Sequence, residues 1–196
     1  MNDIIAPPRP NHVMVDLETF GVQPGSVIVS IGAVAFDPVS SVAGETFYAV
    51  IDPADAQRCG LTLDAKTVLW WLGRSEAARQ ALTVPGMPMV AALHAFSAFW
   101  RRVGGTRFWG HGGNFDEPLL SAAYRVCGIE PPWQFYDSRC TRTIFDLAGV
   151  KPERDGGTHH NALDDAKAQA DAVARAYAIL RERQTPTLVK PPEAAA

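Results

Sequence analysis

The stretch His12–Gly21, HVMVDLETFG, joins a short apolar run to two acidic residues. The apolar run predicts a buried β-strand over His12–Leu17. Asp16 and Glu18 are two residues apart, so on a strand both side chains project from one face, while Leu17 projects from the other. Their Cα atoms should lie roughly 6.6 Å apart, which lets both carboxylates converge on one cation. Such pairs also occur on solvated strand ends, but a buried strand rarely ends in two acids that lack a partner cation.

Two further strands are predicted downstream of this stretch. Val27–Phe36 is apolar and β-branched, and Thr46–Ile51 is a shorter run that is stopped by an Asp-Pro pair. With the first strand, these two segments suit an antiparallel meander. The rest of the chain predicts helices over Thr62–Leu82, Met89–Val103, Phe115–Val126, Cys140–Leu147 and Asn161–Arg181, and short strands over Arg107–Gly110 and Phe135–Asp137. This order indicates an α/β fold with a mixed central sheet flanked by helices.

A third acidic residue follows the predicted strand Arg107–Gly110. Asp116 comes directly after a glycine-rich turn in GHGGNFDEPLL, and Asn114 is placed to cap the helix that begins there. A structural explanation also exists, because an acid in the first turn of a helix is stabilised by the helix dipole. If this turn lies beside Asp16, Asp116 becomes a third carboxylate of the same site.

The segment HHNALDDA, residues 159–166, contains two histidine–aspartate pairs with the same offset: His159 with Asp164, and His160 with Asp165. Helical geometry helps to choose between them. The predicted helix has one apolar stripe, formed by Leu163, Ala166, Ala170, Val173 and Tyr177. Asp164 lies nearly opposite this stripe and suits a capping box with Asn161, whereas Asp165 lies on the flank of the stripe and can reach the sheet. The second pair is therefore preferred, with Asp165 as the metal ligand and His160 as the base.

The order D-x-E, D, H-x-x-x-x-D resembles the DEDDh branch of the 3′→5′ exonucleases, within the ribonuclease-H-like superfamily. VDLET is similar to the first motif of that family, GGNFDEPLL to the second and HNALDDA to the third, so the resemblance covers roughly residues 12–180. A tyrosine-type member carries Tyr at the position of Asn161, which indicates the histidine type. The stretches LWWLGRSEAARQAL and FWGHGGNFDEPLL resemble a smaller branch with phage-type exodeoxyribonucleases and mycobacterial-type exoribonucleases.

This resemblance implies a catalytic set of Asp16, Glu18, Asp116, His160 and Asp165. The four acids would bind two Mg²⁺ or Mn²⁺ ions, with Asp16 bridging them and Asp116 supporting the second. His160 would take a proton from the attacking water. The implied substrate is single-stranded DNA or RNA with a free 3′ end, and the implied product is a nucleoside 5′-monophosphate.

Four residues near these motifs are candidate substrate contacts: Thr19, Phe20, Trp109 and Asn114. Phe20 suits stacking on a terminal base, although a core aromatic explains it equally well. Trp70 and Trp71 are expected at the edge of the core, with the alternative that one of them reaches the substrate cleft or a partner subunit. Two other classes of function stay open, a non-catalytic nucleic-acid-binding relative and a metal hydrolase of small nucleotides. The choice between DNA and RNA and the existence of a homodimer also stay open.

Composition bounds these interpretations. A hydrophobic share of 47% in 196 residues is enough for one core, so we expect a single domain over residues 12–184, with a loose leader (1–11) and tail (185–196). A net charge of −3 argues against a broad basic surface, so nucleic acid must be held locally. Three widely spaced cysteines show neither zinc nor disulfide spacing. With no signal peptide and no membrane span predicted, we expect a cytoplasmic protein.

Overall fold

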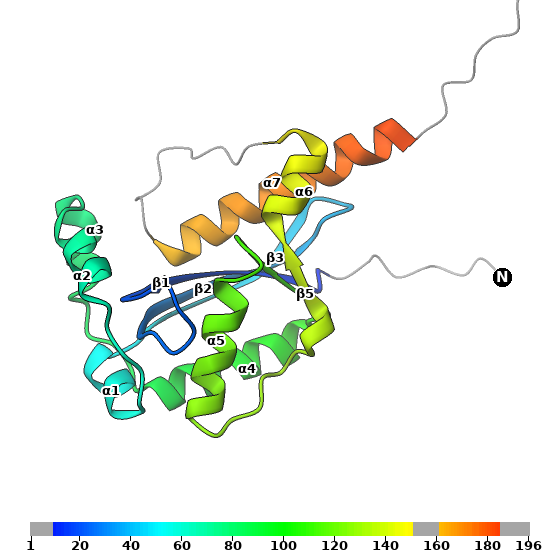
Figure 1. The fold of residues 1–196 in the computed structure, drawn as a ribbon. Coiled ribbons are helices and arrows are strands. Elements are labelled where there is room, and N and C mark those ends of the chain that lie inside the picture. The colour runs from blue at the N-terminus through cyan, green and yellow to red at the C-terminus, as the bar shows by residue number, and fades with distance from the viewer. Residues whose placement is uncertain (1–9, 151–160, 185–196) are drawn as a thin grey trace, which may run out of the picture.

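The computed structural model describes residues 10–150 and 161–184. Its strands are β1 (His12–Thr19), β2 (Ile28–Asp37), β3 (Val42–Val50), β4 (Arg107–Gly110) and β5 (Ser138–Cys140). They form one sheet in the order β3-β2-β1-β4-β5 (Figure 1). β1, β2 and β3 pair antiparallel, while β4 runs parallel to both β1 and β5. The predicted meander and mixed sheet are therefore confirmed, and β1 lies at the centre of the sheet.

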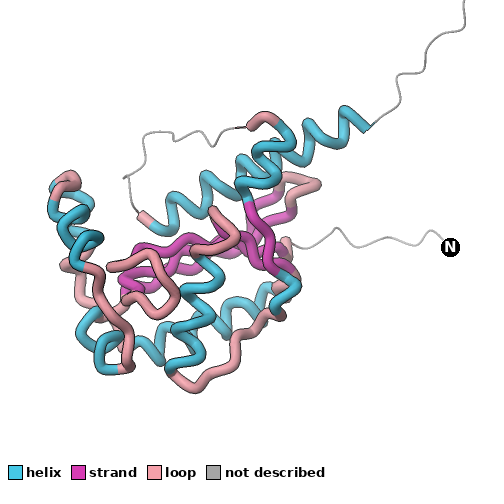
Figure 2. Tube along the Cα trace, viewed as in Figure 1, coloured by secondary structure: helices cyan, strands magenta, loops and turns pink. Residues whose placement is uncertain are grey.

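Seven α-helices accompany the sheet in the described part of the chain. They are α1 (Pro53–Arg58), α2 (Ala65–Leu72), α3 (Glu76–Ala81), α4 (Met89–Val103), α5 (Asp116–Val126), α6 (Thr141–Ala148) and α7 (Ala162–Gln184). Figure 1 shows α6 and α7 on one face of the sheet and α4 and α5 on the other. Figure 2 shows α2 and α3 as separate helices beside one end of the sheet. No helix in the described ranges is both long and apolar enough to cross a membrane.

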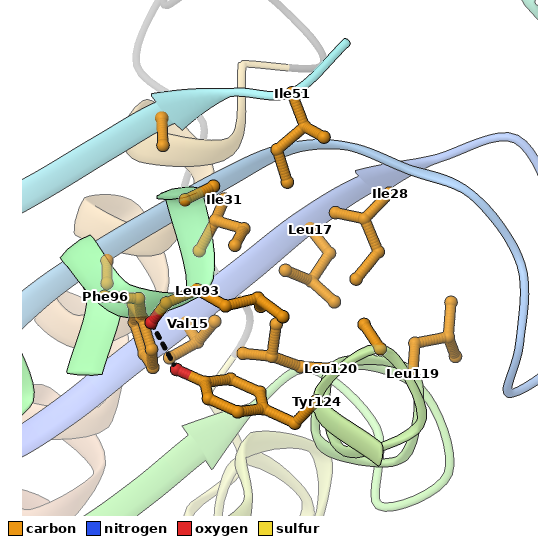
Figure 3. Packing of buried hydrophobic residues seen from close by; sticks show 14 of the residues in the cluster. Val15, Leu17, Ile28, Ile31, Ile51, Leu93, Phe96, Leu119, Leu120 and Tyr124 are labelled. Carbon is orange, nitrogen blue, oxygen red and sulfur yellow. Dashed lines mark hydrogen bonds between the residues drawn. The ribbon is translucent and has the colours of Figure 1, made fainter. Parts of the chain in front are cut away.

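Strand alternation in β1 builds two hydrophobic cores. Val15 and Leu17 pack toward α4 and α5, in the cluster drawn in Figure 3. Met14, the residue before Val15, points to the other face and packs toward α6 and α7. The Tyr124 hydroxyl donates a hydrogen bond of 2.8 Å to the carbonyl of Leu93 and so joins α5 to α4 (Figure 3). Both faces of the sheet are thus covered, which agrees with the burial of every residue of β2.

The single helix predicted over Thr62–Leu82 is wrong. α2 ends at Leu72 with Gly73 as its C-cap, and Ser75 starts α3 by accepting a hydrogen bond from the Ala78 amide. The Asp-Pro pair after β3 also does more than end a strand. Asp52 caps α1, because its side chain accepts from the Ala54 amide at 2.9 Å.

Several strand boundaries also differ from the prediction: β1 ends at Thr19 rather than Leu17, and β2 runs over Ile28–Asp37 rather than Val27–Phe36. Phe135–Asp137 is a 3₁₀ turn, and the strand follows it as β5. β3 begins at Val42 rather than Thr46. The prediction missed its first residues because β3 is an edge strand, and these exposed residues show no apolar pattern. The predicted tail, residues 185–196, and nearly all of the predicted leader lie outside the described residues.

Candidate active site

Asp16 and Glu18 lie on the α7 face of β1. Leu17 belongs to the core on the opposite face, as the alternation predicts. Across the sheet, Asp16 pairs with Gly32 of β2, and Glu18 pairs with Ser30. The two carboxylates therefore leave the centre of the sheet on the side that α7 covers.

Gly32 allows the start of α7 to approach these acids. A Cβ at Gly32 would lie 2.1 Å from the carbonyl carbon of Ala162 and 2.2 Å from the amide nitrogen of Leu163, so any side chain there would displace the helix. The helix start is fixed by Asn161, whose Oδ1 accepts hydrogen bonds from the amides of Leu163 at 3.1 Å and Asp164 at 3.2 Å. Asn161 is thus the N-cap that the sequence predicts.

This approach brings three acids together. Asp16, Glu18 and Asp165 each offer a carboxylate oxygen, and these atoms lie within 4.8 Å of one another. Asp164 is exposed on the other side of α7. Of the two histidine–aspartate pairs, the structure therefore brings the aspartate of the second pair to the acids of β1. His160 itself lies outside the described residues.

Asp116 lies next to this cluster without belonging to the group of three. It is the first residue of α5 and only 1% exposed, and its Oδ2 accepts a 2.7 Å hydrogen bond from the His111 amide. A Cβ at Gly110 would lie 2.8 Å from the same oxygen, so this glycine makes room for the carboxylate. The negative charge of Asp116 raises the pKa of both Asp16 and Glu18, which places it close to the site.

Burial and mutual repulsion make these acids reluctant to ionise without a counter-charge. Burial, then the charges of Asp116 and Glu18, raises the pKa of Asp16 well above its ordinary range. Burial and Asp165 raise the pKa of Glu18 to about 8, and burial raises that of Asp116 to about 7. A hard divalent cation, which prefers oxygen ligands, offsets such a concentration of charge. The cluster fits a magnesium-type or manganese-type ion by its donor atoms, spacing and electrostatics.

Without metal, the protein should lose stability as pH rises between the ordinary Glu18 pKa of 4.5 and its folded value of about 8. Because the folded state then holds more protons than the unfolded state, each increase in pH disfavours folding. We expect the melting temperature in chelator to fall across this interval, and to fall less in Glu18→Gln. Saturating Mg²⁺ or Mn²⁺ should raise the melting temperature most at the upper end, by binding the folded state. Identical pH slopes for the wild type and Glu18→Gln in chelator would contradict this expectation.

The acids line a cleft of about 530 Å³, and residues of α2 form another wall of this cleft. Trp71 is 3% exposed and its Nε1 donates a 2.9 Å hydrogen bond to the Thr19 carbonyl, which ties α2 to the end of β1. Trp70 is 42% exposed and also lines the cleft. The prediction that both tryptophans pack at the core edge is therefore wrong for Trp70, because neighbours on a helix point about 100° apart.

The predicted substrate contacts divide in the structure. Thr19 lines the cleft. Phe20 packs against the core on the α4 and α5 face instead. Trp109 is 3% exposed and packs in the α6 and α7 core, because it pairs with Met14, two residues before Asp16.

Asn114 is neither a helix cap nor a described cleft residue. α5 begins at Asp116, so the cap position is Phe115, and no side-chain hydrogen bond caps this helix. Phe115 itself lines the cleft. α5 therefore begins one residue later than the predicted start at Phe115.

Sequence reasoning missed five polar residues of the cleft. They are Asp64 at the start of α2, Lys66 and Thr67 on α2, His111 after β4 and Gln169 on α7. Gln169 is one helical turn beyond Asp165, so this spacing places it on the same face of α7 but does not show that it reaches Asp16. Lys66 reaches the cleft through the tertiary placement of α2, which no local pattern reveals.

Comparisons with known proteins agree with this geometry. Residues 11–177 match the family model of the 3′-5′ exoribonuclease Rv2179c-like domain. No curated protein matches the chain. The nuclease domain of 3′hExo, a DEDDh family member bound to rAMP, is similar with a TM-score of 0.57 and 13% identity, over 90% of this chain and 94% of that one.

Escherichia coli exonuclease I is similar as well. Its zinc-bound complex with single-stranded DNA has a TM-score of 0.57 and 18% identity, over 90% of this chain and 41% of exonuclease I. Its complex with a dA16 oligonucleotide has 19% identity. This chain therefore spans less than half of exonuclease I, and identities this low establish the shared fold only. The family model, which covers most of the chain, establishes the family: the chain belongs to the 3′-5′ exoribonuclease Rv2179c-like domain family and is a 3′-5′ exonuclease.

Proposed function

We propose that this exonuclease removes nucleoside 5′-monophosphates one at a time from the 3′ end of single-stranded DNA or RNA, with two divalent cations and a histidine base. The convergence of Asp16, Glu18 and Asp165 in one cleft is the observation that carries the proposal. These acids come from β1 and from α7, which are far apart in sequence, and the fold brings them together at a cost in repulsion. A bound cation would offset this repulsion between the carboxylates.

The acids divide the work of holding the cations. Asp16, Glu18 and Asp165 would hold the first ion, and Asp16 with Asp116 would hold the second, with Mg²⁺ or Mn²⁺ as the ions. When bound, two such cations stabilise the charge that develops on the attacking and leaving oxygens of a phosphodiester. The burial of Asp116 and its hydrogen bond from the His111 amide hold that carboxylate in one orientation.

His160 is the proposed general base. It directly precedes Asn161, the cap of α7, and is five residues before Asp165. An imidazole titrates near neutral pH, so it accepts a proton from the attacking water and releases it again within one turnover.

The wall formed by α2 suits the nucleotide part of the substrate. Trp70 offers an exposed indole beside the acids, and bases of any sequence stack on such a ring. Lys66 adds a positive charge in the same cleft, where a phosphate can pair with it. Thr67 and Thr19 complete this polar wall. Local contacts of this kind agree with the net charge of −3, which argues against a broad basic surface.

The proposal needs neither a partner subunit nor an oxidising compartment. The three converging acids all belong to one chain, so a homodimer is not required for chemistry. Cys59, Cys127 and Cys140 are not in disulfides, which suits the reducing cytoplasm that we propose as the location.

End-labelled oligomers test the reaction directly. Single-stranded DNA and RNA labelled at the 5′ end should shorten stepwise in Mg²⁺ or Mn²⁺ and stay intact in chelator. Circular single-stranded DNA should stay uncut, because a site that takes a 3′ terminus finds none there. The ratio of the DNA and RNA rates identifies the preferred substrate.

Three results would reject the proposal. Nicking of circles by homogeneous protein would indicate an endonuclease. Binding of oligomers without metal-dependent hydrolysis would indicate a non-catalytic relative. Hydrolysis of a mononucleotide ester with no action on oligomers would indicate a hydrolase of small nucleotides.

A further inference from the structure

Gln169 contacts the centre of the acidic cluster from α7. Its Nε2 donates a 2.8 Å hydrogen bond to Oδ1 of Asp16, and the side chain is 8% exposed. The residue lies one helical turn beyond Asp165, so the same helix supplies both an acid of the cluster and an amide that binds another acid. No other side-chain hydrogen bond to Asp16 appears in the described part of the structure.

The other half of this amide is unsatisfied. Oε1 of Gln169 is buried and has no hydrogen-bond partner among the described residues. A buried carbonyl without a donor costs free energy, so folding alone would favour an apolar side chain of similar length at this position. A residue that weakens the fold at a functional site is typical of a role in the site.

The direction of the amide follows from chemistry. When a cation is bound, the carboxylate of Asp16 is ionised and only accepts hydrogen bonds, so the amide presents Nε2 to Asp16 and leaves Oε1 without a donor. This contact occupies one lone pair of Oδ1 and fixes the rotation of the carboxylate. The remaining lone pairs of the Asp16 carboxylate stay available to a cation that Glu18 and Asp165 also bind.

We propose that Gln169 is a positioning residue, which holds the carboxylate of Asp16 in the orientation that binds the divalent cation. The inference rests on the proposed function, since it assumes that the cluster binds metal. Partners that orient a metal ligand from behind typically contribute 10–100-fold to metal affinity. Gln169 acts through Asp16 and needs no contact with the cation or with the nucleic acid.

The test measures metal affinity without any nucleic acid. Isothermal titration calorimetry with Mn²⁺ and with Mg²⁺ is run on the wild type, Gln169→Met, Gln169→Asn and Asp16→Asn. Methionine keeps the length of the side chain and removes the donor, whereas asparagine keeps the amide and is one methylene too short. Gln184→Met makes the same substitution at an exposed position of the same helix and serves as the matched control.

We expect Gln169→Met and Gln169→Asn to raise the Kd for both ions by about 10–100-fold. The melting temperature of Gln169→Met in chelator should stay close to that of the wild type, because the substitution removes the unsatisfied carbonyl as well as the donor to Asp16. Gln184→Met should change neither quantity. At limiting metal the Gln169 variants should lose turnover, and added Mn²⁺ should restore it in them but not in Asp16→Asn.

The possible failures are distinguishable. A wild type that binds no divalent cation rejects the proposed function itself. A wild type that binds, with an unchanged Kd in either folded Gln169 variant, overturns only this inference. Equal losses of melting temperature and affinity in both Gln169 variants would show that the glutamine supports the fold rather than Asp16, and would overturn it as well.

Discussion

Asp165→Asn should lower the turnover number about 10²–10³-fold, whereas Asp164→Asn should leave it nearly unchanged. Losing one group that stabilises developing charge typically costs about 10²–10³-fold, and Asp165 would hold a cation that acts on the reacting oxygens. Its carboxylate lies within 4.8 Å of those of Asp16 and Glu18. Asp164 is its sequence neighbour, carries the same side chain and is exposed on the outer side of α7.

The two variants form a matched pair, because they make the same substitution one residue apart on one helix. Turnover is measured on a 5′-labelled single strand at saturating metal, and calorimetry gives the Kd for Mn²⁺. Asp165→Asn should weaken metal binding and raise the melting temperature in chelator, since it removes a repelling charge. If Asp164→Asn were inactive and Asp165→Asn active, the metal would bind on the Asp164 side of α7. That result would reject the site described above.

The elements with long, regular patterns could be predicted from sequence. α4 and β4 have the predicted bounds, because an amphipathic helix of fifteen residues and a short strand between turns are set by local periodicity. The convergence of Asp16 and Asp165 was also predictable in outline. Alternation on β1 and the angle around α7 each depend on local geometry, and the two motifs are linked by the family resemblance.

The wall of the cleft could not be predicted, because tertiary contacts place it. α2 reaches the acids through the hydrogen bond from Trp71 to the Thr19 carbonyl, 52 positions away in sequence. The predicted long helix failed at Gly73–Ser75, where local capping outweighs a weak apolar pattern. Gln169 was missed for a similar reason. Its contact with Asp16 depends on how closely α7 packs on Gly32, and no motif in the sequence reports that distance.

His160→Ala should lower the turnover number by about 10²–10⁴-fold, the range that general-base catalysis contributes. The variant should bind Mn²⁺ with the affinity of the wild type, because the four acids remain. This combination of lost turnover and retained metal separates a base from a metal ligand such as Asp165. His159→Ala, the neighbouring substitution, should lose little activity and serves as the matched control.

A pH–rate profile adds a readout that a structural effect would not move. The wild type should show an ascending limb through the imidazole range, near a pKa of about 6.5, because the base must be neutral to accept the proton of the attacking water. The limb should be blunted in His160→Ala and retained in His159→Ala. An inactive His159→Ala beside an active His160→Ala would transfer the role of base to the first histidine. Loss of Mn²⁺ binding in His160→Ala would instead make this histidine a ligand, and the proposed division between acids that hold metal and a histidine that moves a proton would be wrong.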